Sequence, residues 1–256
     1  LHMFSVNPIK AFSDNYIWLL TTNEGSIVVD PGEAVKILDL IDQDKINLQG
    51  VLITHHHFDH TSGLSDLINK KAVDVYGPEN NIIEINKRVK DLDQISVIGI
   101  DFEVIEIPGH TLDHIAFYAF NDNNPILFCG DTLFAGGCGR VFEGTYEQMF
   151  NSLKKLSNLP ANTKVYCGHE YTLSNLKFAL EVDIQNKYLM DEYNHILELS
   201  KSSTPSLPTT IDKEFRVNPF LRCNDPFIKN KIKKEFGFEG DELGTFAALR
   251  KWKDNF

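Results

Sequence analysis

Between Met3 and about Gly168 the chain alternates short apolar runs with polar turns, which indicates many short strands and few helices. Strands are predicted at 16–20, 26–29, 50–53, 73–76, 102–107, 115–120, 126–129 and 164–167. The first two flank a polar Asn23-Glu24-Gly25 turn and form a predicted hairpin. Apolar residues at helical spacing predict helices at 34–41, 61–69 and 146–156.

The pattern changes from Tyr171 onward, where apolar residues recur at helical intervals. The helical spacing is carried by Leu173, Leu176, Leu180 and Ile184, and helical composition continues to about Leu199. A Ser/Thr/Pro-rich loop follows at 202–208. Three later helices are predicted to start at capping residues: Thr209 with Asp212, Asp225 with Pro226, and Asp241. We therefore expect two domains, residues 3–170 and residues 171–256.

A cluster of histidines directly follows the predicted strand at 50–53. It reads Thr54-His55-His56-His57-Phe58-Asp59-His60 and places imidazoles and one carboxylate within a few residues. Neutral imidazole is the commonest metal ligand in proteins, and loops at strand ends often carry functional residues. An accidental histidine tract would not be expected to follow a core strand with Asp59 in register. The cluster therefore predicts a metal site.

Four of the predicted strands each end at a residue that can bind metal. These residues are His55, His110, Asp131 and His169, and the last two share the local forms Cys-Gly-Asp and Cys-Gly-His. A glycine beside the ligand lets the backbone turn sharply and approach an ion closely. The full candidate set is His55, His57, Asp59, His60, His110, Asp131 and His169.

Seven ligands exceed the four of a tetrahedral zinc site, and they suit two ions about 3.5–4 Å apart. Asp131 is the expected bridge, because a carboxylate offers two oxygens whereas a neutral imidazole offers one acceptor nitrogen. Nitrogen and oxygen donors of this kind accept zinc, iron or manganese, and we expect two divalent ions, zinc first among them.

The roles predicted for the other histidines and for Asp30 are less specific. His56 is out of phase with its neighbours, and we expect it to pack or to support a ligand. His114, in a strand-forming context, is expected to be structural, and His195 to lie on the surface or in the core. Asp30, at a strand end, either hydrogen-bonds a ligand histidine or is a simple turn residue.

Composition narrows the possible partners. A net charge of −11 argues against nucleic acid or membrane as a partner, so an anionic substrate would need a local group of Lys and Arg. No apolar run approaches the roughly 18 residues of a membrane span. Four cysteines without a C-x-x-C pair are expected to be reduced core thiols of a monomeric, cytoplasmic protein. Leu1 and His2 are interpreted as additions before a natural start at Met3.

The motifs together resemble a known superfamily. T-H-H-H-F-D-H, P-G-H-T, C-G-D-T-L-F and C-G-H-E are similar to the metal motifs of the metallo-β-lactamase superfamily. Later segments narrow the resemblance to the glyoxalase II (hydroxyacylglutathione hydrolase) family, namely 136–140, 168–172, 218–222 and Arg250 with Lys253. The resemblance runs from Asn15-Tyr16 to Lys253.

This resemblance implies an α+β fold, a four-layer αββα sandwich followed by a C-terminal α-helical domain. Residues 3–170 would be the catalytic domain and residues 171–256 the helical substrate-binding domain. One metal would take His55, His57 and His110, and the other Asp59, His60 and His169, with Asp131 shared.

The resemblance also implies which residues contact glutathione: Arg140, Tyr171, Arg250 and Lys253. Phe142 departs from the family pattern, in which a tyrosine can reach the glutathione, and loses one hydrogen bond worth about 0.5–1.5 kcal/mol. From the residues alone, Arg250 and Lys253 would instead be a solvated cationic pair that stabilises the end of a helix.

The activity implied is hydrolysis of S-2-hydroxyacylglutathione, such as S-lactoylglutathione, to glutathione and a 2-hydroxy acid such as lactate, as in methylglyoxal detoxification. Metal coordination lowers the pKa of water to around 7, and the resulting hydroxide would attack the thioester carbonyl. Asp59 would accept a proton and Asp131 would bridge the ions. A thiolate can leave without a general acid because the pKa of a thiol is near 8.5.

Three alternatives remain open from the sequence. A persulfide dioxygenase of the same fold would use a single iron, but the extension with Arg250 and Lys253 resembles the hydrolases better. Ribonuclease Z-type processing of RNA is disfavoured by the charge of −11 and the lack of a basic arm. A non-catalytic metal-binding protein would not need all seven ligand positions.

Overall fold

A computed structural model describes residues 3–120 and 123–256, so that Leu1 and His2 lie outside the described residues. The chain divides into two compact units. We call Leu1–Glu106 with Asp113–Gly130 unit 1, and Ile107–Leu112 with Asp131–Phe256 unit 2. The domain boundary expected at residue 170 stays a prediction.

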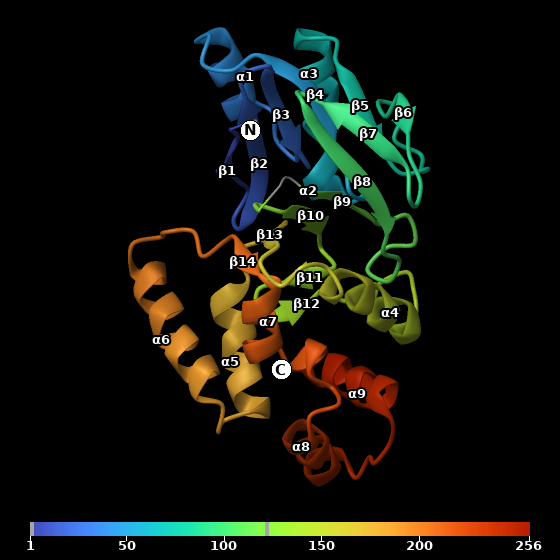
Figure 1. Cartoon of the computed structure of the whole chain (residues 1–256), viewed down its shortest axis with the longest axis vertical. Helices are drawn as coiled ribbons and strands as arrows, with labels where there is room; N and C mark the ends of the chain where they lie inside the picture. The colour runs from blue at the N-terminus through green and yellow to red at the C-terminus, as the bar shows by residue number, and fades with distance from the viewer. Residues whose placement is uncertain (1–2, 121–122) are drawn as a thin grey trace. The chain divides into compact units, whose positions relative to one another are not determined.

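The first sheet of unit 1 contains six strands in sequence order (Figure 1). They are β1 (Ser5–Ala11), β2 (Asn15–Thr22), β3 (Gly25–Val29), β4 (Leu48–Leu52), β5 (Asp74–Gly77) and β6 (Lys87–Arg88). The first three run antiparallel and include the predicted hairpin, whereas β3 to β6 pair in parallel. Parallel pairing needs crossover connections, and these contain α1 (Val35–Asp42), α2 (Phe58–Thr61) and α3 (Leu64–Lys70).

The core of this sheet is formed by apolar side chains from the strands and from the crossover helices. Val28, Val51 and Val75 pack in one buried cluster with Ile37 of α1 and Leu67 of α3. Because β3 and β4 are parallel neighbours, their carboxyl ends meet, and the Asp30 N–H donates to the Leu52 carbonyl at 2.9 Å. The sheet therefore places Asp30 beside the start of the histidine cluster.

Further strands of unit 1 form an antiparallel meander. Its strands are β7 (Gln94–Val97), β8 (Ile100–Glu106), β9 (Ile115–Ala119) and β10 (Ile126–Gly130). Phe102, Phe117 and Phe128 are buried there, and the ring centroid of Phe102 lies 6.4 Å from that of each of the other two. The Ile115 N–H donates to the Thr54 carbonyl at 2.9 Å, so the chain leaving β4 is tied to the start of β9.

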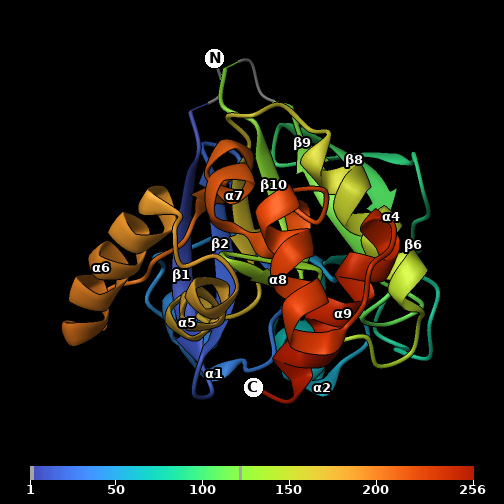
Figure 2. The ribbon, with the colours of Figure 1, turned by 90° about the horizontal axis from the view of Figure 1, so that it is seen from below.

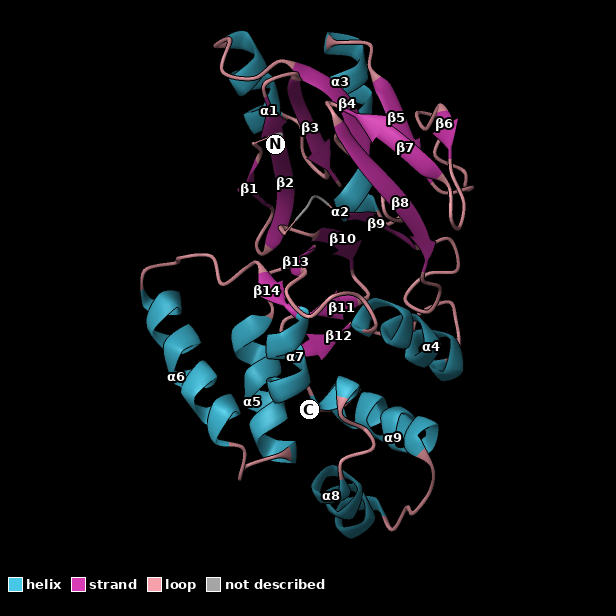
Figure 3. Cartoon of the chain, viewed as in Figure 1, coloured by secondary structure: helices cyan, strands magenta, loops and turns pink. Residues whose placement is uncertain are grey.

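Unit 2 is mostly helical (Figure 3). Two short antiparallel pairs, β11 (Leu133–Phe134) with β12 (Gly137–Cys138) and β13 (Lys164–Cys167) with β14 (Thr209–Thr210), accompany the helices. The helices are α4 (Tyr146–Ser157), α5 (Thr172–Val182), α6 (Lys187–Lys201), α7 (Ile211–Val217), the 3-10 turn η1 (Pro219–Leu221), α8 (Pro226–Phe236) and α9 (Glu242–Asp254). Helices α5 and α6 lie next to each other around a shared apolar cluster (Figures 1 and 2).

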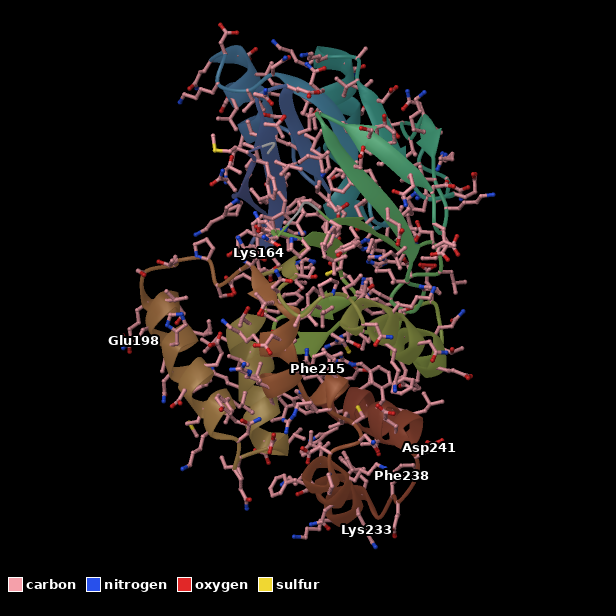
Figure 4. The ribbon with its side chains drawn as sticks, viewed as in Figure 1. Lys164, Glu198, Phe215, Lys233, Phe238 and Asp241 are labelled. Carbon is pink, nitrogen blue, oxygen red and sulfur yellow. The ribbon has the colours of Figure 1, made fainter. Side chains whose placement is uncertain are left out.

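With the exception of α5, the helices described in unit 2 start at residues whose side chains accept a backbone N–H group. Asp225 accepts from Phe227 and is followed by Pro226, and Asp241 accepts from Gly244, as both motifs predict. Asp241 and Phe238 lie in the connection from α8 to α9 (Figure 4). None of the helices within residues 3–120 and 123–256 has the length and hydropathy needed to cross a membrane.

Three predicted helices are wrong in detail. The helix expected at 61–69 is present as α3 but begins only at Leu64, because the Gly63 N–H donates to the Pro31 carbonyl at 2.9 Å and Thr61 ends the separate short helix α2. The helical pattern expected to reach Leu199 is broken between α5 and α6, where Asn186 caps α6. Thr210 caps α7 in place of Thr209, whose hydroxyl instead donates to Glu214.

Glu214 of α7 is a buried carboxylate that holds the turn between β11 and β12. Its Oε1 accepts from the Gly136 N–H at 2.7 Å and from Asn218 Nδ2 at 3.0 Å, and its Oε2 accepts from the Thr209 hydroxyl at 2.7 Å. Asn218 Nδ2 also donates to the Gly137 carbonyl at 2.9 Å. Burial raises the pKa of Glu214, against the lowering effect of these donors.

We predict that Glu214→Ala destabilises the protein by about 3 kcal/mol, because buried donors on Gly136 and Asn218 lose their acceptor. Glu214→Gln keeps one acceptor oxygen and serves as the matched variant. The pKa of Glu214 is higher in the folded protein than in the unfolded protein. Its contribution to the free energy of unfolding therefore falls as the pH rises from the unfolded pKa through the folded pKa. Denaturant unfolding should therefore show the stability of Glu214→Gln increasing relative to that of the native protein over the pH range that begins at the ordinary glutamate pKa of 4.5. A constant difference across that range would contradict this assignment.

Candidate metal centre

In unit 1 the histidine cluster leaves β4 and enters α2 around the side chain of Asp30. Asp30 Oδ1 accepts from the Thr54 N–H at 2.8 Å, and Oδ2 accepts from the Thr54 hydroxyl at 2.6 Å. The same Oδ2 lies 3.0 Å from His60 Nδ1. The expected hydrogen bond between Asp30 and a candidate histidine is thereby confirmed, and Asp30 is more than a turn residue.

The side chains of the cluster converge within unit 1. The ring centroid of His55 lies 4.9 Å from that of His57 and 4.3 Å from that of His60. Asp59 Oδ2 lies 3.2 Å from His60 Nε2. The His-x-His-x-Asp-His motif therefore gathers its polar atoms through one turn of helix instead of along an extended strand.

Asn15 is a residue of this region that the motif does not reveal. Its Nδ2 donates to Asp59 Oδ2 at 2.8 Å and to the Asp59 carbonyl at 3.2 Å. Gly32 permits the approach of this backbone, because a Cβ there would lie 1.8 Å from the Asp59 carbonyl oxygen. The carboxylate of Asp59 is therefore oriented by β2 as well as by its own helix.

His114 has the structural position expected of it, whereas the part expected for His56, to pack or to support a ligand, stays a prediction because its side chain is 39% exposed. His56 Nε2 lies 4.0 Å from Asp113 Oδ1. His114 is buried, donates from Nδ1 to the Ile115 carbonyl at 3.1 Å and stacks on His55 with centroids 4.4 Å apart and planes at 11°. The stacked ring restricts the plane of His55.

In unit 2 one carboxylate oxygen faces two imidazoles. Asp131 Oδ2 lies 3.2 Å from His169 Nε2 and 3.4 Å from His110 Nε2. His110 donates from Nδ1 to the Arg140 carbonyl at 2.8 Å. The ring of His169 stacks on Tyr171 with centroids 4.6 Å apart and planes at 3°. Three of the predicted ligands are thus brought together within unit 2.

The donors in both units fit divalent metal ions. Thr54 gives its hydroxyl proton to Asp30, so its oxygen accepts the Nδ1 proton of His55 at 2.9 Å. His60 and His110 commit Nδ1 to Asp30 and to the Arg140 carbonyl in the same way. A histidine whose Nδ1 proton is held by the protein presents Nε2 as its ligand atom. The assignment of each residue to a particular ion stays a prediction.

The predicted substrate contacts differ in exposure. The side chain of Arg140 is 59% exposed, and its Nε lies 3.9 Å from Asp254 Oδ1. Lys253 lies over the ring of Phe178, and its pKa is lowered by burial and by the nearby charges of Arg250 and Arg140. Arg250 is 3% exposed, so the solvated pair inferred from the residues alone is wrong for this position. Its guanidinium donates to Asp254 on the same helix and to the carbonyl of Cys138.

Phe142 lies beside one of the predicted metal ligands. Its side chain is largely exposed, and its ring centroid lies 5.2 Å from that of His110. The backbone N–H of Phe142 donates to the His110 carbonyl at 3.3 Å. Whether Arg140, Tyr171 and Lys253 bind a substrate stays a prediction.

Comparison with known proteins identifies the family. A sequence model of the metallo-beta-lactamase superfamily matches residues 12–169, and one of the hydroxyacylglutathione hydrolase C-terminus matches residues 170–256. Hydroxyacylglutathione hydrolases of Psychromonas ingrahamii, Chromohalobacter salexigens and Pseudoalteromonas translucida are 43%, 45% and 46% identical, over 99% of this chain and 100% of each relative. The chain belongs to the hydroxyacylglutathione hydrolase family.

Solved structures confirm the metallo-β-lactamase fold. ETHE1 from Myxococcus xanthus is similar with a TM-score of 0.65 and 24% identity, over 98% of this chain and 99% of that one. TTHA1623, solved in a di-iron-bound form, is similar with a TM-score of 0.59 and 25% identity, over 84% of this chain and 100% of that one. The expected α+β fold with a C-terminal helical region is thereby confirmed.

We predict that Asp30→Asn lowers metal affinity by about 10- to 100-fold, the usual effect of removing a partner that orients a ligand histidine. Asparagine keeps the shape of the side chain but loses the second anionic oxygen shared by Thr54 and His60. Asp44 has the same left-handed backbone, with φ of 54° at both positions, and is exposed, so Asp44→Asn is the matched control. Competition with a chromogenic chelator measures the affinity, and equal values for Asp30→Asn and Asp44→Asn would remove Asp30 from this role.

Proposed function

We propose that the protein hydrolyses S-2-hydroxyacylglutathione thioesters, S-lactoylglutathione among them, to glutathione and a 2-hydroxy acid. The observation that carries this proposal is similarity along the whole chain to enzymes named for that reaction, at 43–46% identity. The match at residues 170–256 to the hydroxyacylglutathione hydrolase C-terminus supports it independently of the metal motif. A metal motif alone would fit many hydrolases of this fold.

We propose two divalent ions, zinc first among them, with seven ligands: His55, His57, Asp59, His60, His110, Asp131 and His169. The Nδ1 hydrogen bonds of His55, His60 and His110 support this set, because they direct Nε2 to serve as ligand. The similarity to TTHA1623, which was solved with two irons, supports a binuclear site in this fold. Such ions supply Lewis acidity and a water whose pKa is lowered to around 7.

Two carboxylates of the protein complete the proposed chemistry. Asp59, held in orientation by Asn15, accepts the proton of the attacking water. Asp131 would be the ligand shared by the two ions, because a carboxylate offers two oxygens whereas a neutral imidazole offers one acceptor nitrogen. The leaving thiol has a pKa near 8.5, so it departs as thiolate without a dedicated acid.

For substrate binding we propose a helical domain of residues 171–256, with Arg140, Tyr171 and Lys253 as contacts to the glutathione. The supporting observation is a local group of cations in a chain of net charge −11. Burial lowers the pKa of Lys253, and the nearby positive charges of Arg250 and Arg140 lower it further. An anionic peptide would relieve that repulsion. We further propose that the protein is monomeric and cytoplasmic.

The first test is the loss of thioester absorbance with S-lactoylglutathione, using metal-loaded protein and protein stripped with a chelator. We expect turnover only in the loaded protein, and Asp131→Asn should lower both turnover and metal content severely. Asp101→Asn, an exposed carboxylate on β8, controls for the loss of one negative charge. Oxygen uptake with a persulfide substrate in place of thioester cleavage would overturn the proposal in favour of a dioxygenase. Full turnover and full metal content in Asp131→Asn would remove Asp131 from the ligand set.

We predict that Lys253→Ala raises KM more than it lowers kcat, because the ammonium contacts the substrate away from the bond that is cut. The pKa of Lys253 lies below the ordinary value of 10.5, so the native KM should rise with pH as this group loses its proton. The KM of Lys253→Ala should be high at low pH as well, and should not rise further where the native KM does. Lys251→Ala, on the exposed side of the same helix, is the matched control. A KM for Lys253→Ala equal to that of the control would contradict the contact.

A further inference from the structure

The Asp59 carboxylate of unit 1 is only partly buried. Its side chain is 36% exposed, whereas that of the neighbouring His60 is 1% exposed and has its Nδ1 fixed on Asp30. Asn15 Nδ2 donates to Asp59 Oδ2 at 2.8 Å and to the Asp59 carbonyl at 3.2 Å. A carboxylate that is open to solvent keeps its rotational freedom unless bonds of this kind restrict it. Asn15 therefore restricts the orientation of Asp59.

Asn15 is itself fixed at the start of β2. Its side chain is buried, and β1 pairs with β2 as far as this residue. The turn just before it is tied to the segment that follows β3, because the Phe12 N–H donates to Glu33 Oε2 at 3.0 Å. A Cβ at Gly32, in the same segment, would lie 1.8 Å from the Asp59 carbonyl oxygen, so the backbone that accepts from Asn15 is closely packed. The amide therefore acts from a rigid support.

Asp59 Oδ2 and His60 Nε2 face each other at 3.2 Å. The Nδ1 proton of His60 is held by Asp30, so Nε2 of the neutral ring carries a lone pair. An ionised carboxylate oxygen is likewise an acceptor and supplies no proton. Two acceptor atoms at this distance repel each other, and a cation between them replaces the repulsion by two attractions. The contact therefore favours a shared cation and is unfavourable in the metal-free protein.

The amide of Asn15 offsets that repulsion. It donates to the same Oδ2 atom that faces His60, and an amide nitrogen cannot take the place of a ligand because it is a donor only. Without this bond the Asp59 carboxylate would turn away from His60 in the metal-free protein. An arriving ion would then have to order the carboxylate again, and its affinity would fall accordingly.

We propose that Asn15 is a positioning residue that sets how many ions the protein retains: it holds the Asp59 carboxylate opposite His60 Nε2, so that the ion shared by these two residues stays bound. The inference rests on the proposed function in taking Asp59 and His60 as ligands of one ion of two. It goes further, because it assigns the affinity for that ion, and not for the other, to a residue outside the ligand set.

Two substitutions of Asn15 test this role. Asn15→Leu has a similar shape and removes both donated bonds, and Asn15→Ala removes them without adding bulk. The matched control is Asn86→Leu, because Asn86 Nδ2 also donates to a carboxylate of unit 1, Asp74 Oδ1, at 3.0 Å. Asp59→Asn is the reference in which the carboxylate itself is changed.

Metal binding and catalysis are measured on each full-length variant, after circular dichroism and thermal unfolding establish that it is folded. Metal-free protein is titrated with Co²⁺, whose visible absorption bands report the ligands of each equivalent bound. Competition with a chelator gives the affinity for each equivalent. The kcat and KM with S-lactoylglutathione are measured at limiting and at excess metal.

We expect the native protein and Asn86→Leu to bind two equivalents of Co²⁺. In Asn15→Leu and Asn15→Ala one equivalent keeps its native affinity, and the affinity for the other falls by about 10- to 100-fold, the usual effect of removing a partner that orients a ligand. The kcat falls at limiting metal and recovers at excess metal, while KM changes little. Adding Asn15→Leu to Asp59→Asn weakens metal binding no further, because both changes act on one carboxylate.

Three results overturn the proposal. Asn15→Leu and Asn15→Ala could bind both equivalents as tightly as Asn86→Leu, they could weaken both equivalents equally, or Asn15→Leu could cause a further loss when it is added to Asp59→Asn. The last two results would indicate a general structural role for Asn15.

The metal titrations need no substrate, so they separate this proposal from the proposed function. Selective loss of one equivalent in the Asn15 variants of a protein that does not cleave the thioester would support the positioning role and contradict the proposed function. Native binding of both equivalents by these variants, in a protein that does cleave the thioester, would do the reverse.

Discussion

The proposed chemistry depends on hydrogen bonds that commit Nδ1 of the histidines to the protein. His55 gives its Nδ1 proton to the Thr54 oxygen, His60 to the Asp30 carboxylate and His110 to the Arg140 carbonyl. Each bond selects one tautomer and one ring orientation before any ligand binds. Ordering these rings in advance lowers the entropy lost when an ion is bound.

The acceptors for these protons are placed by different parts of the structure. Asp30 is placed by the parallel pairing of β3 and β4, which brings two strand ends together. The Arg140 carbonyl ends the stretch of residues 131–140, whose backbone accepts from Asn218 and Arg250 and donates to Glu214. Residues far along the chain therefore contribute to the site by fixing backbone, without contributing a ligand.

Several parts of this arrangement could be predicted because they rest on local patterns. The strands that precede His55, Asp131 and His169 were predictable from apolar runs that end abruptly in polar residues, a pattern set by burial of β-branched side chains. The caps Asp225 and Asp241 were predictable because a cap is a bond between near neighbours. The role of Asp30 could be offered only as one of two alternatives, because its partners are 24 and 30 residues away.

Other elements gave no local signal. Strand β1 contains Pro8 and Lys10 and, within residues 3–120 and 123–256, pairs with β2 alone, so it forms as an edge strand where alternation is weak. The sequence by itself determined the family, and it supplied the candidate ligands at the ends of strands. Only the tertiary structure decided that Asn15 orients Asp59, that His114 stacks on His55 and that Arg250 is buried against Cys138. Those contacts join residues distant in sequence, and their energies depend on burial and distance, which no local pattern encodes.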